Sequence, residues 1–331
     1  MTHSKPGNLA ITAPDKQRNN MLIGVLFTVV CLTWGTTWIG IKIAVETVPP
    51  ILASGLRFLI AFPIFLAFAK LKKAPLRFPK EERLFFILIV FIYFSLPYLL
   101  INVGEQYVSS GLTALLFSSM PVFVVIFSSL ILHERIRILQ MVGIAIGFMS
   151  LFMILEEHGA EFGYKSVLGV IAILTAAVMH ALCYVITKKR GSEISIITFN
   201  TLPIGIAGAL LTTLGMVVEH PYANGFSLAS ICSLAYLGVV ASVGGFLAYF
   251  HLLKRISPVA LSFVFIIFPV IALVLGSWYE GRPISLAFVF YCSLLLLGFA
   301  MTKLSGTERH PIIGKPRFIK VDGFVSESRR S

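Results

Sequence analysis

Ten long stretches of this chain consist of apolar residues and carry almost no Asp, Glu, Lys or Arg. A helix needs about 20 such residues to cross the hydrocarbon core of a bilayer. The stretches are apolar on all faces and lack the alternation of barrel strands, so they predict an all-α polytopic membrane protein with ten transmembrane helices. The expected spans are residues 21–41, 51–69, 84–104, 108–132, 138–155, 166–187, 194–218, 228–253, 256–279 and 283–302.

The composition agrees with this class of protein. Of the 331 residues, 57% are hydrophobic and 13% are charged, whereas about a quarter of the residues in a soluble domain are charged. All four cysteines lie within apolar stretches, so neither a disulfide framework nor a zinc site is expected. The chain has no Walker loop for ATP, and no cofactor is expected.

Lys and Arg gather at alternate ends of the expected spans. If the N-terminus is cytoplasmic, 23 of the 27 basic residues fall on the cytoplasmic side, where membrane proteins carry an excess of positive charge. We therefore expect a multi-pass protein of the plasma (bacterial inner) membrane with both termini cytoplasmic. This topology explains the net charge of +12 without nucleic acid. The expected partners are the lipid bilayer and a small-molecule substrate, and a homodimer is left open.

The chain also contains an internal repeat. Each half holds five expected spans, so the second half enters the membrane in the opposite orientation. Inverted repeats are typical of transporters that alternate between two conformations around a central site. We expect a cytoplasmic tail (1–20), two repeats (21–156 and 166–303) and a basic cytoplasmic tail (304–331). An offset of 146 residues pairs Trp34 with His180, Trp38 with Tyr184, Lys42 with Lys188, and Glu134 with Glu280.

Short motifs in both halves resemble those of a known family. The first half contains Trp34-Gly35, Arg57-Phe58, Asn102, Gln106-Tyr107, Ser109-Ser110, Pro121, and His133-Glu134-Arg135 followed by Gly143 and Gly147. The second half contains Ser257-Pro258, Pro269-Val270 and Glu280. Over residues 21–303 the chain resembles the EamA family of the drug/metabolite transporter superfamily. The second half has Val289 and Ser293 at the positions of Gly143 and Gly147, which leaves close packing of the tenth span in doubt.

The resemblance implies secondary transport, often export, of a small metabolite such as an amino acid or a related compound. Two alternatives stay open, namely efflux of drugs or toxic compounds, and exchange of phosphorylated metabolites or nucleotide sugars. An enzyme is not expected, because the chain lacks motifs such as His-Glu-x-x-His and Gly-x-Ser-x-Gly. A channel would leave the repeat unexplained.

Three residues inside the spans stand out as candidates for substrate binding. Trp34 lies well inside the first span and could form an aromatic wall, or pack against a neighbouring helix. Arg57 is costly in a membrane unless it faces water or a partner, so it could hold an anionic substrate group, or pair with Glu46 or Glu105. His180 could bind substrate and carry a proton, or form a structural hydrogen bond between helices.

Other polar side chains complete the expected site. No Asp or Glu is expected deep inside a span. Trp38 is interpreted as an interfacial anchor. Glu134 and Glu280 are expected to pair with Arg135 and Arg282 at the two membrane surfaces and to contribute to gating or to fold stability. Polar groups in otherwise apolar helices are Thr36, Tyr93, Tyr98, Asn102, Tyr184, Asn200 and Tyr249, and five of these are expected to bind substrate, namely Thr36, Tyr98, Asn102, Tyr184 and Tyr249.

Overall fold

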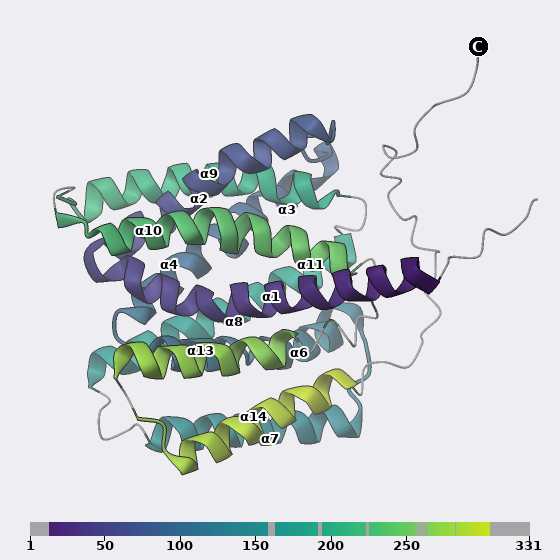
Figure 1. Ribbon diagram of the computed structural model, residues 1–331, viewed down its shortest axis with the longest axis vertical. Helices are drawn as coiled ribbons and strands as arrows, with labels where there is room; N and C mark the ends of the chain where they lie inside the picture. The colour runs from purple at the N-terminus through teal and green to yellow at the C-terminus, as the bar shows by residue number, and fades with distance from the viewer. Residues whose placement is uncertain are drawn as a thin grey trace, which may run out of the picture.

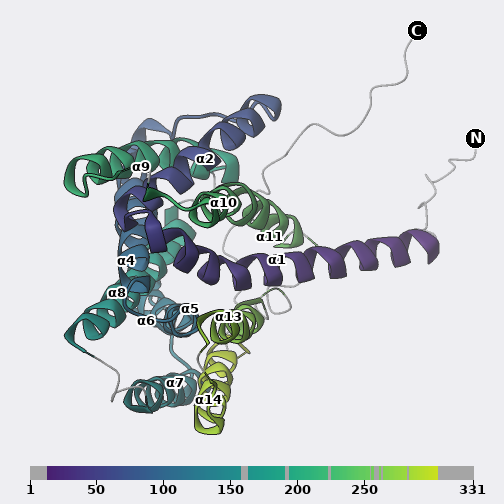
Figure 2. The same cartoon turned by 60° about the vertical axis from the view of Figure 1, so that its left-hand side comes forward.

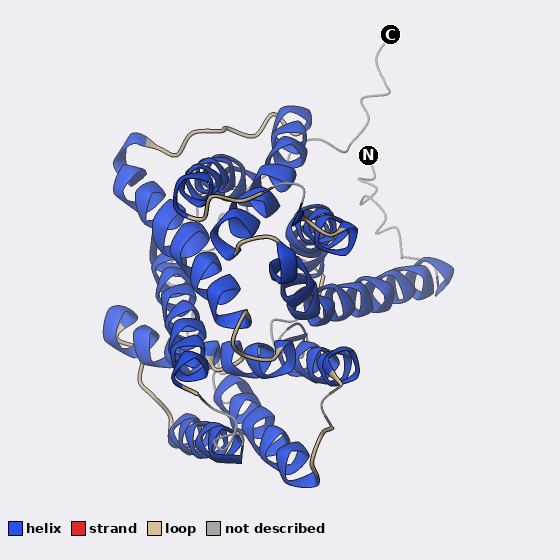
Figure 3. Ribbon diagram, turned by 90° about the vertical axis from the view of Figure 1, so that its left-hand side faces the viewer, coloured by secondary structure: helices blue, strands red, loops and turns tan. Residues whose placement is uncertain are grey.

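The regular structure described for this chain is helical, as the apolar stretches predict (Figure 3). The computed structural model describes residues 13–157, 163–190, 194–222, 225–253, 255–256, 261, 264–281 and 283–304, and no strand occurs among these residues. Helices are favoured inside a bilayer because they satisfy their own backbone hydrogen bonds.

Seven helical segments of the described chain are long and apolar enough to cross a membrane, as in a multi-pass membrane protein. They are Asn20–Thr47, Pro50–Leu71, Lys80–Glu105, Ser110–Leu132, Tyr164–Arg190, Ile196–Val218 and Leu228–Tyr249. Three shorter apolar helices are Ile138–Ile154, Val264–Glu280 and Leu286–Thr302. The count of ten membrane spans stays a prediction.

The helix bounds differ from the expected spans mainly at the N-terminus. The first helix, α1, covers Ala13–Thr47, so the part of the expected tail from Ala13 onward is helical. Residues 1–12 and the expected basic tail from 305 onward lie outside the described residues. The remaining uninterrupted helices are α2 (Pro50–Leu71), α7 (Ile138–Glu157), α8 (Tyr164–Arg190), α9 (Ile196–Val218), α13 (Val264–Glu280) and α14 (Leu286–Leu304).

Two of the long helices contain a π-helical segment. The third apolar stretch forms η1 (Lys80–Glu82), α3 (Arg83–Leu88), the π segment η2 (Ile89–Ser95) and α4 (Leu96–Glu105). The eighth forms α10 (Leu228–Tyr236), the π segment η6 (Leu237–Gly244) and α11 (Gly245–Leu253). Ser95 and Ser242 each donate a hydroxyl hydrogen bond to the carbonyl five residues earlier, at 2.7 and 2.9 Å. These wide turns are rare and often occur at functional sites.

The fourth apolar stretch is divided into α5 (Ser110–Phe117) and α6 (Met120–Leu132). Ser118 and Ser119 stand at the break, and their hydroxyls donate to carbonyls of the preceding turn at 2.7 and 2.6 Å. Pro121 fits within the first turn of α6, where its missing N–H costs nothing.

Two helix pairs flank a central group of helices (Figures 1 and 2). α2 packs on α9 on one side and α7 packs on α14 on the other, while α1 contacts α13 and α10, and α8 contacts α4 and α6. Glycines allow the flanking pairs to approach closely. A Cβ atom on Gly298 would lie 2.7 Å from the carbonyl oxygen of Gly143. The last helix is therefore closely packed despite Val289 and Ser293, because Gly298 supplies the contact in their place.

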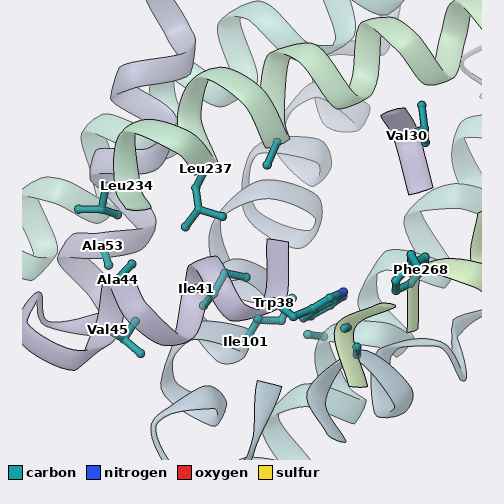
Figure 4. Close-up of a cluster of buried hydrophobic side chains, with 14 of the residues drawn as sticks. Val30, Trp38, Ile41, Ala44, Val45, Ala53, Ile101, Leu234, Leu237 and Phe268 are labelled. Atoms are coloured by element: carbon teal, nitrogen blue, oxygen red, sulfur yellow. The ribbon is translucent and has the colours of Figure 1, made fainter. Parts of the chain in front are cut away.

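A cluster of buried apolar side chains surrounds α1 (Figure 4). It includes Trp38, Ile41 and Ala44 of α1 together with Leu237 and Phe268 from the second half. Trp38 is 6% exposed, and its ring centroid lies 5.2 Å from that of Phe117. The interpretation of Trp38 as an interfacial anchor is therefore wrong, because it packs in the interior.

Candidate functional site

A cavity of about 370 Å³ lies in the bundle, lined by the central helices together with α2 and α9. This volume is within the range of small-molecule sites, roughly 300–1,000 Å³. Helices from both halves of the chain contribute to its lining. Of the residues expected to bind substrate, the lining includes Trp34, Arg57, Tyr98, His180, Tyr184 and Tyr249.

Aromatic rings form one wall of the cavity. Trp34 stacks on Tyr249 with ring centroids 5.0 Å apart, and Phe265 meets Trp34 edge-on at 5.7 Å. Gly245 begins α11 beside this group, where a Cβ atom would lie only 2.8 Å from Nε1 of Trp34. Such a wall can hold an apolar or aromatic part of a ligand.

Arg57 brings a positive charge to the cavity from α2. It is 5% exposed, and its Nε donates to the hydroxyl of Ser242 at 3.0 Å. Its guanidinium carbon lies 5.0 Å from the ring centroid of Tyr98. No ion pair joins it to Glu46 or Glu105 among the described residues, and its Nη1 is buried without a hydrogen-bond partner.

The π segment η6 explains the position of Arg57. Ser242 receives the guanidinium hydrogen bond while its own hydroxyl donates to the carbonyl of Leu237. One N–H direction of Arg57 is thereby fixed, and Nη1 is left for another acceptor. A guanidinium can hold a carboxylate through charge-assisted hydrogen bonds.

His180 lies on α8 among aromatic rings. Its side chain is 5% exposed, and its ring centroid is 4.8 Å from that of Tyr93 and 5.3 Å from that of Phe117. Its Nδ1 lies 2.9 Å from the carbonyl oxygen of Ala176, a geometry that suits Nδ1 as the donor in a neutral imidazole. The prediction that it carries a proton is untested.

Two further polar atoms at the cavity lack a hydrogen-bond partner. The sequence did not indicate either of them as a substrate-binding group. Nε1 of Trp38 is a buried donor and Oδ1 of Asn200 is a buried acceptor, and neither has a hydrogen-bond partner. Both residues line the cavity. Because buried polar atoms are nearly always hydrogen-bonded, these atoms and Nη1 of Arg57 are available to a ligand or to water.

Two residues expected to bind substrate lie outside the cavity lining. The hydroxyl of Thr36 donates to the carbonyl of Leu32 at 2.7 Å and lies 2.5 Å from the hydroxyl of Tyr236. The amide of Asn102 donates to Ser54 Oγ at 2.8 Å, which joins α4 to α2. Both side chains connect helices in this structure.

The two ends of the bundle differ in their charged groups. At one end, which we call the Lys188 end, Glu134 pairs with Lys188 at 2.8 Å, with side chains 47% and 56% exposed. Lys188 thus takes the place expected of Arg135 because the end of α8 lies beside the end of α6. The cavity extends toward this end through Thr187 and Ile194.

The opposite end, which we call the Glu105 end, contains the C-termini of α1 and α4 and the N-terminus of α5. Glu280 Oε1 accepts hydrogen bonds from the backbone N–H and the hydroxyl of Ser110, both at 2.8 Å. Arg282, its expected partner, lies outside the described residues. Glu105, the last residue of α4, is completely buried.

Known proteins resemble the chain over most of its length. Protein PagO of Salmonella typhimurium is 41% identical over 280 residues, which cover 85% of this chain and 92% of the relative. The uncharacterized inner membrane transporter YedA of Escherichia coli K12 is 31% identical over 274 residues, 80% of this chain and 84% of the relative. A solved crystal structure covers 87% of this chain and 99% of its own, with a TM-score of 0.60 at 18% identity, which supports the fold alone.

A family model matches the chain twice. The model of the EamA-like transporter family covers residues 21–156 and 167–304. These two matches include most of the described helices and every residue that lines the cavity. Together with the similarity to relatives named as transporters, they show that the chain belongs to the EamA-like transporter family.

Proposed function

We propose that this transporter moves a small amphipathic metabolite with a carboxylate group, such as an amino acid, across the plasma (bacterial inner) membrane by alternating access, in the direction of export. The observation that carries the proposal is Nη1 of Arg57, a buried donor without a partner beside a cavity with an aromatic wall. A carboxylate would accept from the guanidinium, while the apolar part of the substrate would contact Trp34 and Tyr249.

The same proposal includes ten spans in two inverted repeats. The family model matches each half separately, and α9 begins 146 residues after α2. Helix contacts correspond as well, because α1 packs on α13 and α11 in the way that α8 packs on α6 and α4. Two similar halves around one site would allow each end of the cavity to open in turn.

The cavity favours this substrate class over the two alternatives. No Asp or Glu is among the described residues that line it, and a carboxylate is the group that would hold a cationic drug. Arg57 is the single Lys or Arg among the described lining residues, so one positive charge would face a phosphate ester that carries more negative charge. Lys42 donates to the carbonyls of Glu105 and Val108 at 2.6 and 3.2 Å, so its ammonium group is already engaged.

Flux measurements in proteoliposomes test the proposal. Labelled amino acids and related carboxylates are offered first, and each transported compound is then challenged with its methyl ester and with phosphate esters. We expect the esters lacking a free carboxylate to compete weakly. Equal competition by the methyl ester would overturn the carboxylate contact, and stronger competition by phosphate esters would favour the exchanger.

Variants of Arg57 test whether its guanidinium contacts the substrate carboxylate. Because a hydrogen bond to a charged group contributes about 1.5–3 kcal/mol, Arg57→Ala should reduce substrate affinity roughly 10- to 150-fold. Arg57→Lys should retain part of the affinity, since the charge remains. The matched control is Arg83→Ala at the exposed start of α3. Normal flux in a folded Arg57→Ala protein would show that Arg57 does not bind the substrate.

A further inference from the structure

Glu105 is the described carboxyl group with the least access to water. It ends α4, its exposed fraction is 0%, and neither of its carboxyl oxygens has a hydrogen-bond partner. A buried carboxylate without donors is strongly disfavoured relative to its neutral form. The contrast with Glu280 is direct, because the Glu280 carboxylate accepts two hydrogen bonds from Ser110.

Charged side chains reach the surroundings of Glu105 from several neighbouring helices. α1 contributes Lys42, whose ammonium donates to the backbone carbonyl of Glu105 and not to its carboxyl group. α13 contributes Glu280 and α2 contributes Arg57, whose charges act on the carboxyl together with that of Lys42. α8 contributes Lys165, which lies over the ring of Tyr107, and α5 has no titratable side chain.

The carboxyl group lies just beyond the wall of the cavity. Ile101, one helical turn before Glu105 on α4, lines the cavity, as does Ile41, the residue before Lys42 on α1. Opening the Glu105 end would therefore have to move the segments that carry Lys42 and Glu105. Water would then reach the carboxyl group, which favours the carboxylate, and Lys42, which already donates to the Glu105 carbonyl, would supply a counter-charge nearby.

We propose that Glu105 is a proton-binding site which must be occupied for the Glu105 end to close. On opening, the carboxyl O–H bond breaks and the proton passes to water at that end, leaving the carboxylate near Lys42. On closing, the carboxylate takes a proton back from water at the same end before it is buried. Closure is thereby linked to pH. The inference rests on the proposed alternating access, but its test needs no substrate.

Spin labels on the Glu105 end measure its closure directly. Tyr164 begins α8 and Tyr222 follows α9 at this end, and their side chains are 79% and 87% exposed. Both are replaced by Cys and labelled in a Cys232→Ser background, because Cys232 is the exposed one of the four cysteines. We expect the distance between the labels in nanodiscs to increase as the pH rises.

The Glu105→Gln variant should remove this dependence. The amide cannot ionise, so the short distance should persist at every pH, and Glu105→Leu should behave in the same way if Gln impairs folding. The control is Glu46→Gln, an exposed carboxylate near the same end. A distance that does not respond to pH in the otherwise unchanged protein would overturn the proposal, and so would an unchanged response in a folded Glu105 variant.

Infrared spectroscopy supplies a second measurement that does not depend on labels. In the unlabelled protein at neutral pH, we expect the carbonyl stretch of a protonated carboxylic acid, which Glu105→Gln should lose and Glu46→Gln should keep. Absence of this band, or its survival in Glu105→Gln, would overturn the proposal. If no compound is transported while both measurements succeed, the proposed function fails and the proton site stands.

Discussion

The two ends of the bundle carry related charged residues but differ in their exposure. Lys42 and Glu280 of the Glu105 end occupy the repeat positions of Lys188 and Glu134. At the Lys188 end the two side chains form an exposed ion pair, whereas at the Glu105 end Lys42 donates to carbonyls and Glu280 accepts from Ser110. The comparison teaches that equivalent residues have different partners when one end is buried among helices and the other meets solvent.

The largest expected difference is in chemical accessibility. Ser110 is fully buried at the Glu105 end, while the Glu134 side chain is 47% exposed. In a Cys232→Ser background in detergent, Ser110→Cys should react with a maleimide at least about 10-fold more slowly than Glu134→Cys, because a buried thiol reacts only after local opening. Equal rates would mean that the Glu105 end is not closed.

Stability should depend strongly on Glu280. Glu280→Ala leaves the backbone N–H of Ser110 without its acceptor, and an unsatisfied buried donor costs about 1–3 kcal/mol. We expect a lower melting temperature in detergent. The variant Glu280→Gln keeps an acceptor oxygen and should recover part of the loss. A melting temperature of Glu280→Ala equal to that of the parent would contradict the role of this contact.

Glu219 should have a smaller effect. Its two carboxylate oxygens accept from the backbone N–H groups of Ile51 and Leu52 at 2.9 Å, and so cap α2 at the Glu105 end. Loss of a helix cap costs about 0.5–2 kcal/mol, so Glu219→Ala should lower the melting temperature less than Glu280→Ala does. The reverse order would show that capping of α2 matters more than the Ser110 contact.

The smallest effect is expected at the Lys188 end. An exposed ion pair contributes about 0.2–1 kcal/mol and is screened by salt. A double-mutant cycle with Glu134→Ala and Lys188→Ala should therefore give a small coupling energy that falls as salt is added. A coupling energy as large as the effect of Glu280→Ala, and insensitive to salt, would remove the distinction between the two ends.

The helical class could be predicted well from the sequence, because a stretch of about 20 residues without charged side chains can be recognised without knowing the fold. The irregular features were missed. Whether Ser95 and Ser242 close π turns, or Ser118 and Ser119 interrupt a helix, depends on local hydrogen bonds that the apolar pattern does not encode.

The candidate site was predicted in part for a related reason. Arg57 and Trp34 are conspicuous against an apolar background, and both line the cavity. A helix that is apolar on all faces does not reveal which face turns inward, so the positions of Thr36 and Asn102 outside the lining could not be foreseen. Glu105 was expected only as a possible partner of Arg57, because it stands at the end of a span and is buried only by its neighbours.

The paired π segments bear on how the molecule arose. A π turn can be regarded as an α-helix with one additional residue, and η2 and η6 occupy related places in two halves that match the same family model. One insertion in an ancestral half, followed by gene duplication, accounts for both with a single event, whereas separate origins require two. If the halves arose by duplication in this way, the wide turn that supports Arg57 through Ser242 is older than the two-repeat protein.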